Sequence, residues 1–269
     1  MMRSLVLGGI LVGLVVLAAL LSFLWTPFDP VQVDAAHRLL GSGAAHWFGT
    51  DKFGRDLLSQ IMVGARTTLY VGVVAVGIAA VIGTPLGILA GMSPRWLGEF
   101  VMRVNDLVLA FPALLLAIMF GAVFGADTLT AMVAIGIATI PSFARIARSG
   151  TLQVMSTEFV LAARAGGRSR VHIARRHVLP NISGLLIVQA SVSFAIAVLA
   201  EAALSFLGFG TRPPTPSWGR MLQESQELLT VQPRLALVPG IAIAVAVLGF
   251  NLLGDGLRDR LDPRLAARV

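Results

Sequence analysis

The sequence predicts an all-α polytopic membrane protein with six transmembrane helices and both termini in the cytoplasm. Of its 269 residues, 56% are hydrophobic and only 13% are charged, whereas soluble domains carry about 25% charged residues. Charged residues are absent from six long windows, which are residues 4–28, 67–94, 107–126, 128–144, 177–200 and 235–254. The basic residues are also divided unequally between the loops on the two sides of such a bundle.

Each window is long enough to cross a membrane as a helix. The shortest has 17 residues, and about 17 to 25 apolar residues span the hydrocarbon core of a bilayer. The runs are continuous rather than alternating over segments of about ten residues, which argues against a transmembrane β-barrel. A soluble fold is disfavoured because the remaining chain is too short to cover six apolar helices.

The first window begins after Arg3, as a secretory signal peptide would. Its apolar run is longer than the roughly 7 to 15 residues usual in signal peptides. We therefore expect an uncleaved first transmembrane helix.

The basic residues predict the orientation of the bundle. If the first helix starts in the cytoplasm, the cytoplasmic segments hold 14 of the 21 basic residues and the exterior segments hold 7. This asymmetry follows the positive-inside rule and places both termini in the cytoplasm. The high sequence pI, near 11.4, is thus explained mostly by basic residues on the cytoplasmic side. A lipid bilayer is the expected surrounding, and nucleic acid is not an expected partner.

The predicted spans divide the chain into three parts. Residues 1–66 hold the first helix and an exterior loop, whose apolar Leu57, Leu58 and Ile61 recur at the spacing of an amphipathic interfacial helix starting at Asp56. Residues 67–262 form a core with five spans, a cytoplasmic loop at 148–181 and an exterior loop at 205–234. The five spans are 67–94, 104–126, 128–147, 182–204 and 235–254. Residues 263–269 form a cytoplasmic tail.

The cytoplasmic loop contains signals for two short helices joined by a bend. Ser156 or Thr157 can cap the first helix, and Glu158 suits its positive end. Gly166 and Gly167 are expected to stop it. Ser169 can cap a second helix, which Pro180 is expected to end.

The first of these helices presents a face of small residues. Ala162, Ala163 and Ala165 would permit another protein to approach closely, while the seven arginines at positions 145–181 would suit anionic lipid. The residues alone leave partner docking and lipid contact as equal alternatives.

Four further residues are candidates for gating or structural roles: Arg103, Asp106, Glu201 and Trp218. Arg103 and Asp106 have the i, i+3 spacing of a helical ion pair, which is favoured over a proton relay. Glu201 is expected near the exterior, where it is solvated or contacts the loop to Trp218. We treat it as structural.

Metal chemistry is not expected of this chain. It has no cysteine, and His172 and His177 are five residues apart, a spacing that does not share one α-helical face.

The second span contains a row of glycines, at positions 72, 77, 83, 87 and 91. These small residues predict close packing against another helix.

The cytoplasmic loop resembles the signature of ABC importer permeases. That signature reads Glu-Ala-Ala, three residues, Gly, nine residues, Ile, one residue, Leu-Pro. Ala162, Ala163, Gly167, Leu179 and Pro180 fall on its positions. The departures from it are Leu161 in place of the Glu and His177 in place of the Ile.

Two other segments resemble the second permease subunit of the dipeptide, oligopeptide and nickel importers. They are Phe48-Gly49-Thr50-Asp51 through Gly54-Arg55-Asp56, and Glu201 through Trp218-Gly219. The resemblance covers roughly residues 46 to 262. Three motifs in the expected order make chance similarity very improbable.

The resemblance implies a type I ABC importer permease in the bacterial inner membrane. It implies a heterodimer with a second permease, two cytoplasmic ATPase subunits and an external substrate-binding protein. Residues 157–180 would dock in a groove of an ATPase, with Glu158, Ala162, Ala163, Gly167, Leu179 and Pro180 as its site residues. Short peptides are the expected cargo, with nickel or another small solute as the alternative.

The chain itself lacks the residues to hydrolyse ATP, so we do not expect an enzyme. A Walker A loop needs Gly-Lys followed by Ser or Thr, and the only lysine, Lys52, lies between Asp51 and Phe53. ATP and Mg²⁺ are therefore expected on partner subunits, and no cofactor is expected on this chain. An ion-coupled secondary transporter is the competing class, but it normally places ionisable groups near the midplane of the membrane, and the six windows contain no charged residue.

Overall fold

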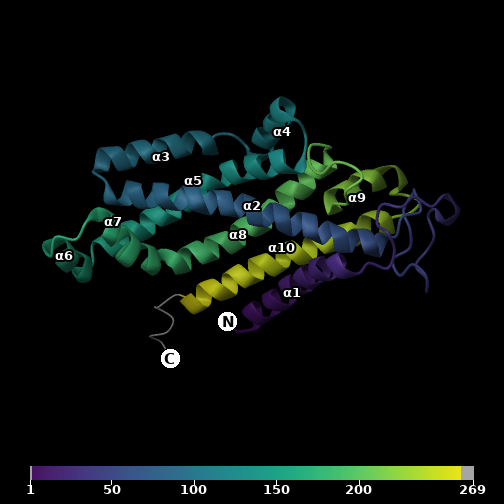
Figure 1. The fold of residues 1–269 in the computed structure, drawn as a ribbon, viewed down its shortest axis with the longest axis horizontal. Helices are drawn as coiled ribbons and strands as arrows, with labels where there is room; N and C mark the ends of the chain where they lie inside the picture. Colours follow the sequence, from purple (N-terminus) through teal and green to yellow (C-terminus); the bar gives the residue numbers. More distant parts are fainter. Residues whose placement is uncertain (1, 262–269) are drawn as a thin grey trace.

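A computed structural model describes residues 2–261, and within them the chain folds into an elongated bundle of helices (Figure 1). The helices are α1 (Met2–Leu24), α2 (Leu57–Met92), α3 (Arg95–Leu109), α4 (Ala113–Phe124), α5 (Thr128–Met155), α6 (Glu158–Ala165), α7 (Arg170–Ile173), α8 (Leu179–Phe206), α9 (Trp218–Ser225) and α10 (Arg234–Leu261). A π-helical turn at Ala174–Val178 joins α7 to α8. We call the two ends of the bundle the α6 end and the α9 end.

The third predicted span is broken rather than continuous. Five helices in the described part are long and apolar enough to cross a membrane, while α3 and α4 form a pair bent by 76°. Pro112 immediately precedes α4. Because proline lacks an N–H and disfavours helical geometry in the residue before it, Phe111 interrupts the helix. The described part therefore holds five long apolar helices, and six spans if the bent pair counts as one.

Several predicted boundaries also differ. The expected interfacial helix at residues 57–66 is the first part of α2, where Leu57, Ser59 and Gln60 are buried. Helix α5 continues to Met155, beyond the predicted end at 147. Pro180 does not end a helix: it lies in the first turn of α8, directly after the π-helical turn that joins α7 to α8.

Helices α1 and α10 pack antiparallel through glycines. A Cβ added at Gly8 would lie 2.4 Å from the backbone nitrogen of Leu253, and one added at Gly256 would lie 2.6 Å from the Cα of Leu5. The start of α1 thus lies beside the last turns of α10, and both point toward the α6 end (Figure 1). The two described ends of the chain therefore lie on the same side of the bundle, as expected for an even number of spans.

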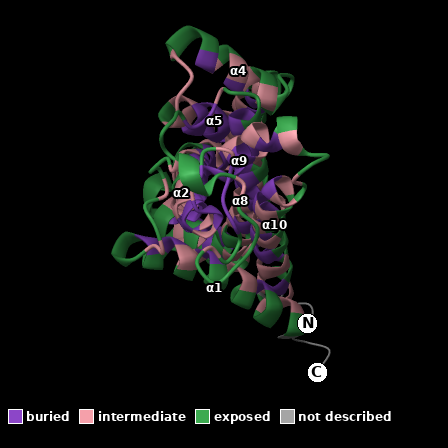
Figure 2. Cartoon of the chain, turned by 90° about the vertical axis from the view of Figure 1, so that its right-hand side faces the viewer, coloured by how far each residue is buried: buried purple, intermediate pink, exposed green. Residues whose placement is uncertain are grey.

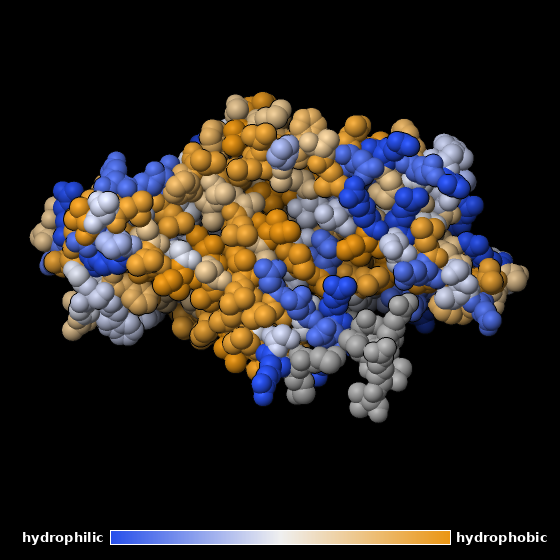
Figure 3. Space-filling model, turned by 180° about the vertical axis from the view of Figure 1, so that it is seen from behind, coloured by the Kyte–Doolittle hydropathy of each residue, from blue (hydrophilic) through white to orange (hydrophobic). Residues whose placement is uncertain are grey.

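The surface has the pattern of a membrane-spanning bundle. Buried residues concentrate where α2, α5, α8 and α9 meet, and exposed residues cover the outer helices (Figure 2). A broad hydrophobic surface separates hydrophilic regions at the two ends (Figure 3). Many exposed side chains of the long helices are large and apolar, including Val73 and Val81 of α2. Such a surface would aggregate in water but is suited to lipid.

Helices α2 and α5 approach each other along a row of glycines. A Cβ added at Gly87 would lie 2.3 Å from the carbonyl oxygen of Ala144 and 2.6 Å from the Cβ of Ala147. Gly83 and Gly91 face the same helix at similarly short range, whereas no heavy atom lies within 4 Å of the Cβ position at Gly77. The predicted close packing is confirmed for these positions and is wrong for Gly77.

This contrast supplies a matched pair of variants. We expect Gly87→Ala to destabilise the folded chain by about 1–3 kcal/mol, because the added methyl group forces α5 away from α2. Gly77→Ala should be neutral or slightly stabilising, since alanine favours the helix and meets no atom there. Thermal unfolding in detergent measures both, and equal melting temperatures would contradict the packing described.

Candidate functional site

Helix α6 stands at one end of the bundle and is anchored through its inner face. Val160 is fully buried and packs in a cluster with Ile173, Val178, Ile182 and Ala147. Partly buried side chains from the ends of α2 and α5 complete this cluster, which we call the α6 anchor. It joins α6 to α2, α5 and α8, so that these helices form one packed unit.

Apolar side chains are exposed on both flanks of α6, one on each side of the buried Val160. Phe159 and Leu161 are 46% and 53% exposed, and Ala162 and Glu158 are exposed beside them. Ala163 instead packs against the α6 anchor. The predicted small-residue face is therefore divided, because a helical turn places adjacent alanines in different directions.

Gly167 ends the α6 segment in a left-handed conformation. Its φ is +74°, and no heavy atom lies within 4 Å of its Cβ position. The Ser169 hydroxyl then accepts a hydrogen bond from the backbone N–H of His172 at 3.2 Å. The predicted helix stop at Gly167 and the predicted cap at Ser169 are both confirmed. Leu179 and Pro180 follow as exposed residues in the first turn of α8.

The π-helical turn brings two histidines together. The rings of His172 and His177 lie 6.0 Å apart, and the His177 ring lies 5.9 Å from Phe159 of α6. The prediction that a five-residue spacing separates these histidines is wrong here, because a π-helix repeats its hydrogen bonds every five residues.

Asp106 pairs with a different arginine from the one predicted. Its Oδ1 lies 2.6 Å from Nη2 of Arg145 on α5. Arg103 is exposed on α3 and forms no ion pair within residues 2–261. The pair with Arg145 links α3 to α5, and because both side chains are more than half exposed it contributes about 1 kcal/mol or less.

Glu201 and Trp218 lie in the interior at the α9 end. Glu201 is 1% exposed, so of the two predicted alternatives the solvated position is excluded and the contact with the loop to Trp218 is confirmed. Its Oε1 accepts hydrogen bonds from the Ser205 hydroxyl at 2.7 Å and from the Thr211 hydroxyl of that loop at 3.4 Å. The Trp218 indole donates to the carbonyl oxygen of Ile61 at 3.0 Å. Trp218 is also buried, so it fixes the start of α9 against the first turns of α2.

A charged cluster at the α9 end was not anticipated from the sequence. The Nε of Arg55 donates to Oδ2 of Asp51 at 2.6 Å, and its Nη2 donates to Glu224 of α9. Arg220 contacts the same Glu224 at 2.9 Å, and Gln60 donates to Asp51 at 3.1 Å. We call these five residues the Arg55 cluster.

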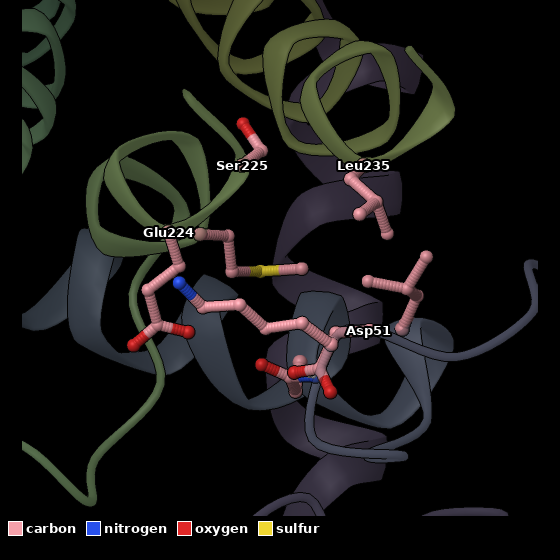
Figure 4. Close-up of a pocket in the computed structure, with 8 residues that line it drawn as sticks. Asp51, Glu224, Ser225 and Leu235 are labelled. Carbon is pink, nitrogen blue, oxygen red and sulfur yellow. Dashed lines mark hydrogen bonds between the residues drawn. The ribbon is translucent and has the colours of Figure 1, made fainter. Parts of the chain in front are cut away.

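The Arg55 cluster holds α9 to the loop that precedes α2. Figure 4 shows Glu224 extending from α9 and Asp51 from the loop around one small cavity. This cavity encloses about 10 Å³, which is room for about one water molecule and no larger ligand. The cluster is therefore structural. The i, i+4 spacing of Asp51 and Arg55 was visible in the sequence, but nothing there indicated Glu224.

The comparisons with known proteins agree with this architecture. The profile of the family described as binding-protein-dependent transport system inner membrane component matches residues 83–267. The dipeptide transport system permease protein DppC of Alkalihalophilus pseudofirmus is 42% identical over 260 residues, covering 97% of this chain and 86% of the relative. The glutathione transport system permease protein GsiD of Pectobacterium atrosepticum is 40% identical over 261 residues, covering 97% and 87%.

Solved structures share the fold at low sequence identity. A chain of the MetNI methionine ABC transporter in an inward-facing conformation superposes with a TM-score of 0.62 at 18% identity, covering 76% of this chain and 96% of that one. An amino acid ABC transporter gives 0.54 at 17% identity, covering 75% and 94%. The fold is thus that of ABC transporter membrane subunits. The chain belongs to the family of binding-protein-dependent transport system inner membrane components, which are permease subunits of the inner membrane.

We expect the buried ion pairs of Arg55 to stabilise the fold more than the exposed pair formed by its neighbour Lys52. Arg55→Gln leaves the Asp51 carboxylate, which is only 11% exposed, without its cation and removes one of the two arginines that pair with Glu224, which is 18% exposed. We expect a loss of about 2 kcal/mol or more. Lys52→Gln breaks a pair with Glu227, whose side chain is 77% exposed, and should cost less than about 1 kcal/mol. Thermal unfolding compares them. Equal losses would show that the cluster does not hold α9.

Proposed function

We propose that this chain forms half of the translocation pathway of an ATP-driven importer of short peptides. The cargo is inferred from the relatives named for dipeptide and glutathione transport, and from the putative peptide transport system permease of Brucella suis, which is 42% identical over 263 residues. Nickel or another small solute is the alternative within the same family. The expected assembly contains a second permease, two ATPase subunits and an external binding protein.

The mechanism rests on one observation: α6 has one side packed against the bundle and exposes apolar side chains elsewhere. Phe159 and Leu161 expose apolar area on the two flanks of the buried Val160, although this helix lies beyond the apolar part of the bundle. Exposed apolar residues at a hydrophilic end favour contact with another protein. We assign this exposed surface of α6 to the cytoplasmic ATPase, in the orientation that the basic residues predict.

The inner face of α6 would carry the movement of the ATPase into the membrane. Val160 and Ile173 pack against Ala147 of α5 and Ile182 of α8. Packed interiors transmit displacement because they compress little. ATP binding and hydrolysis on the partner would therefore move α5 and α8 together with α6, opening and closing the pathway at the interface with the second permease.

The docking role predicts loss of the ATPase from the complex. Phe159→Ser combined with Leu161→Ser removes the exposed apolar area of α6 and should reduce copurification of the ATPase at least tenfold, since buried apolar anchors dominate such contacts. Leu152→Ser, on an exposed site of α5, is the matched control and should leave copurification unchanged. Equal recovery of ATPase with both variants would contradict docking at α6.

The bend at Gly167 predicts a loss of coupling. Gly167→Ala places a side chain at a φ of +74°, which costs about 1–2 kcal/mol and favours a different bend. We expect peptide uptake per ATP hydrolysed to fall several-fold in proteoliposomes. Gly166→Ala is the control, because the φ of Gly166 is −75° and alanine adopts it readily.

The same proteoliposomes distinguish the competing class of transporter. Uptake should require ATP, the ATPase subunits and the second permease. Accumulation of peptide by this chain alone on a proton or sodium gradient would overturn the proposal in favour of an ion-coupled carrier.

A further inference from the structure

An apolar groove lies at the α6 end between the last turns of α2 and the α7–α8 junction. It encloses about 370 Å³. Its apolar lining includes Ile88, Leu89 and Met92 on one side and Val171, Ala174 and Leu179 on the other. Thr84 and Ser93 provide hydroxyl groups, and Arg170 and Arg175 lie at its border with the hydrophilic end.

A second cavity continues from this groove and is lined by arginines. It encloses about 310 Å³ and is bounded by Arg164, Arg168 and Arg170, with Met92 and Ile173. Met92 and Arg170 line both cavities, so the two are adjacent. Within residues 2–261, none of these three guanidinium groups forms an ion pair with a carboxylate.

The local charge balance favours an anion in the arginine-lined cavity. Residues 145–181 contain seven arginines and one acidic residue, Glu158. Three cations around one cavity repel each other unless a counter-charge is present. Arginine also binds phosphate with two parallel hydrogen bonds.

The apolar lining of the groove favours an acyl chain over a peptide as its ligand. A peptide in it would bury one amide per residue, and the groove offers two hydroxyl groups beside its two border arginines. Unpaired amides are costly to bury. An acyl chain has no hydrogen-bonding group and gains from contact with Ile88, Leu89 and Val171.

We propose that this groove and the arginine-lined cavity together form a binding site for an acidic phospholipid. An acyl chain lies between α2 and the α7–α8 junction, and the phosphate headgroup lies among Arg164, Arg168 and Arg170. Basic pockets between transmembrane helices are known to hold anionic headgroups in this way. The site borders the α6 anchor through Ile173 and Met92, so a bound lipid would brace the unit that contacts the ATPase.

Native mass spectrometry of the detergent-purified complex tests the site directly. The complex is equilibrated with equal amounts of phosphatidylglycerol and phosphatidylcholine, and the lipids retained are counted. We expect phosphatidylglycerol to be preferred, and Arg168→Gln with Arg170→Gln to reduce that preference at least tenfold, since each arginine near a membrane contributes roughly a fivefold factor. Arg176→Gln, an exposed neighbour outside both cavities, should leave it unchanged.

A second variant tests the groove independently of charge. Ala174→Phe fills the apolar groove and retains every arginine, and it should reduce retention of both lipids. Equal retention of the two lipids by the unaltered complex would overturn the proposal. So would an unchanged preference in the double arginine variant, or a copurified peptide displaced by Ala174→Phe. None of these outcomes depends on which solute is transported, so they are separate from the test of peptide import.

Discussion

The close approach of α2 and α5 is the constraint on which the rest of the structure depends. Gly83, Gly87 and Gly91 allow the backbone of α5 to lie directly against α2, which side chains of any size would prevent. Without water in the bilayer to drive association, such packing is a main source of helix contact energy. It aligns α2, which has 36 residues, with the helix that leads directly into α6.

Helix α2 therefore connects the two ends of the molecule. At the α9 end its first turns receive the Trp218 indole and border the Arg55 cluster. At the α6 end, Ile88 and Met92 pack into the α6 anchor. One continuous helix thus packs against the α6 anchor at one end and against α9 at the other.

The sequence was sufficient for the features that depend on local composition. Apolar windows located the spans, and residues with special backbone or capping chemistry, such as Gly167 and Ser169, located the short helices. It was insufficient where distant segments meet: nothing near Asp106 indicates Arg145, and nothing near Arg55 indicates Glu224 on α9. The hydropathy of residues 107–126 likewise concealed the bend between α3 and α4, because apolar composition does not distinguish a straight span from a bent one.

The central claim is that α6 and α2 move as one rigid unit. The chain has no cysteine, so spin labels can be attached at two introduced cysteines, Ala165→Cys on α6 and Val81→Cys on α2, both at exposed positions. Double electron–electron resonance then measures the distance between them in the assembled transporter with and without ATP. We predict one narrow distance distribution that is the same in both states. A broad distribution, or a maximum that shifts when ATP binds, would contradict the account.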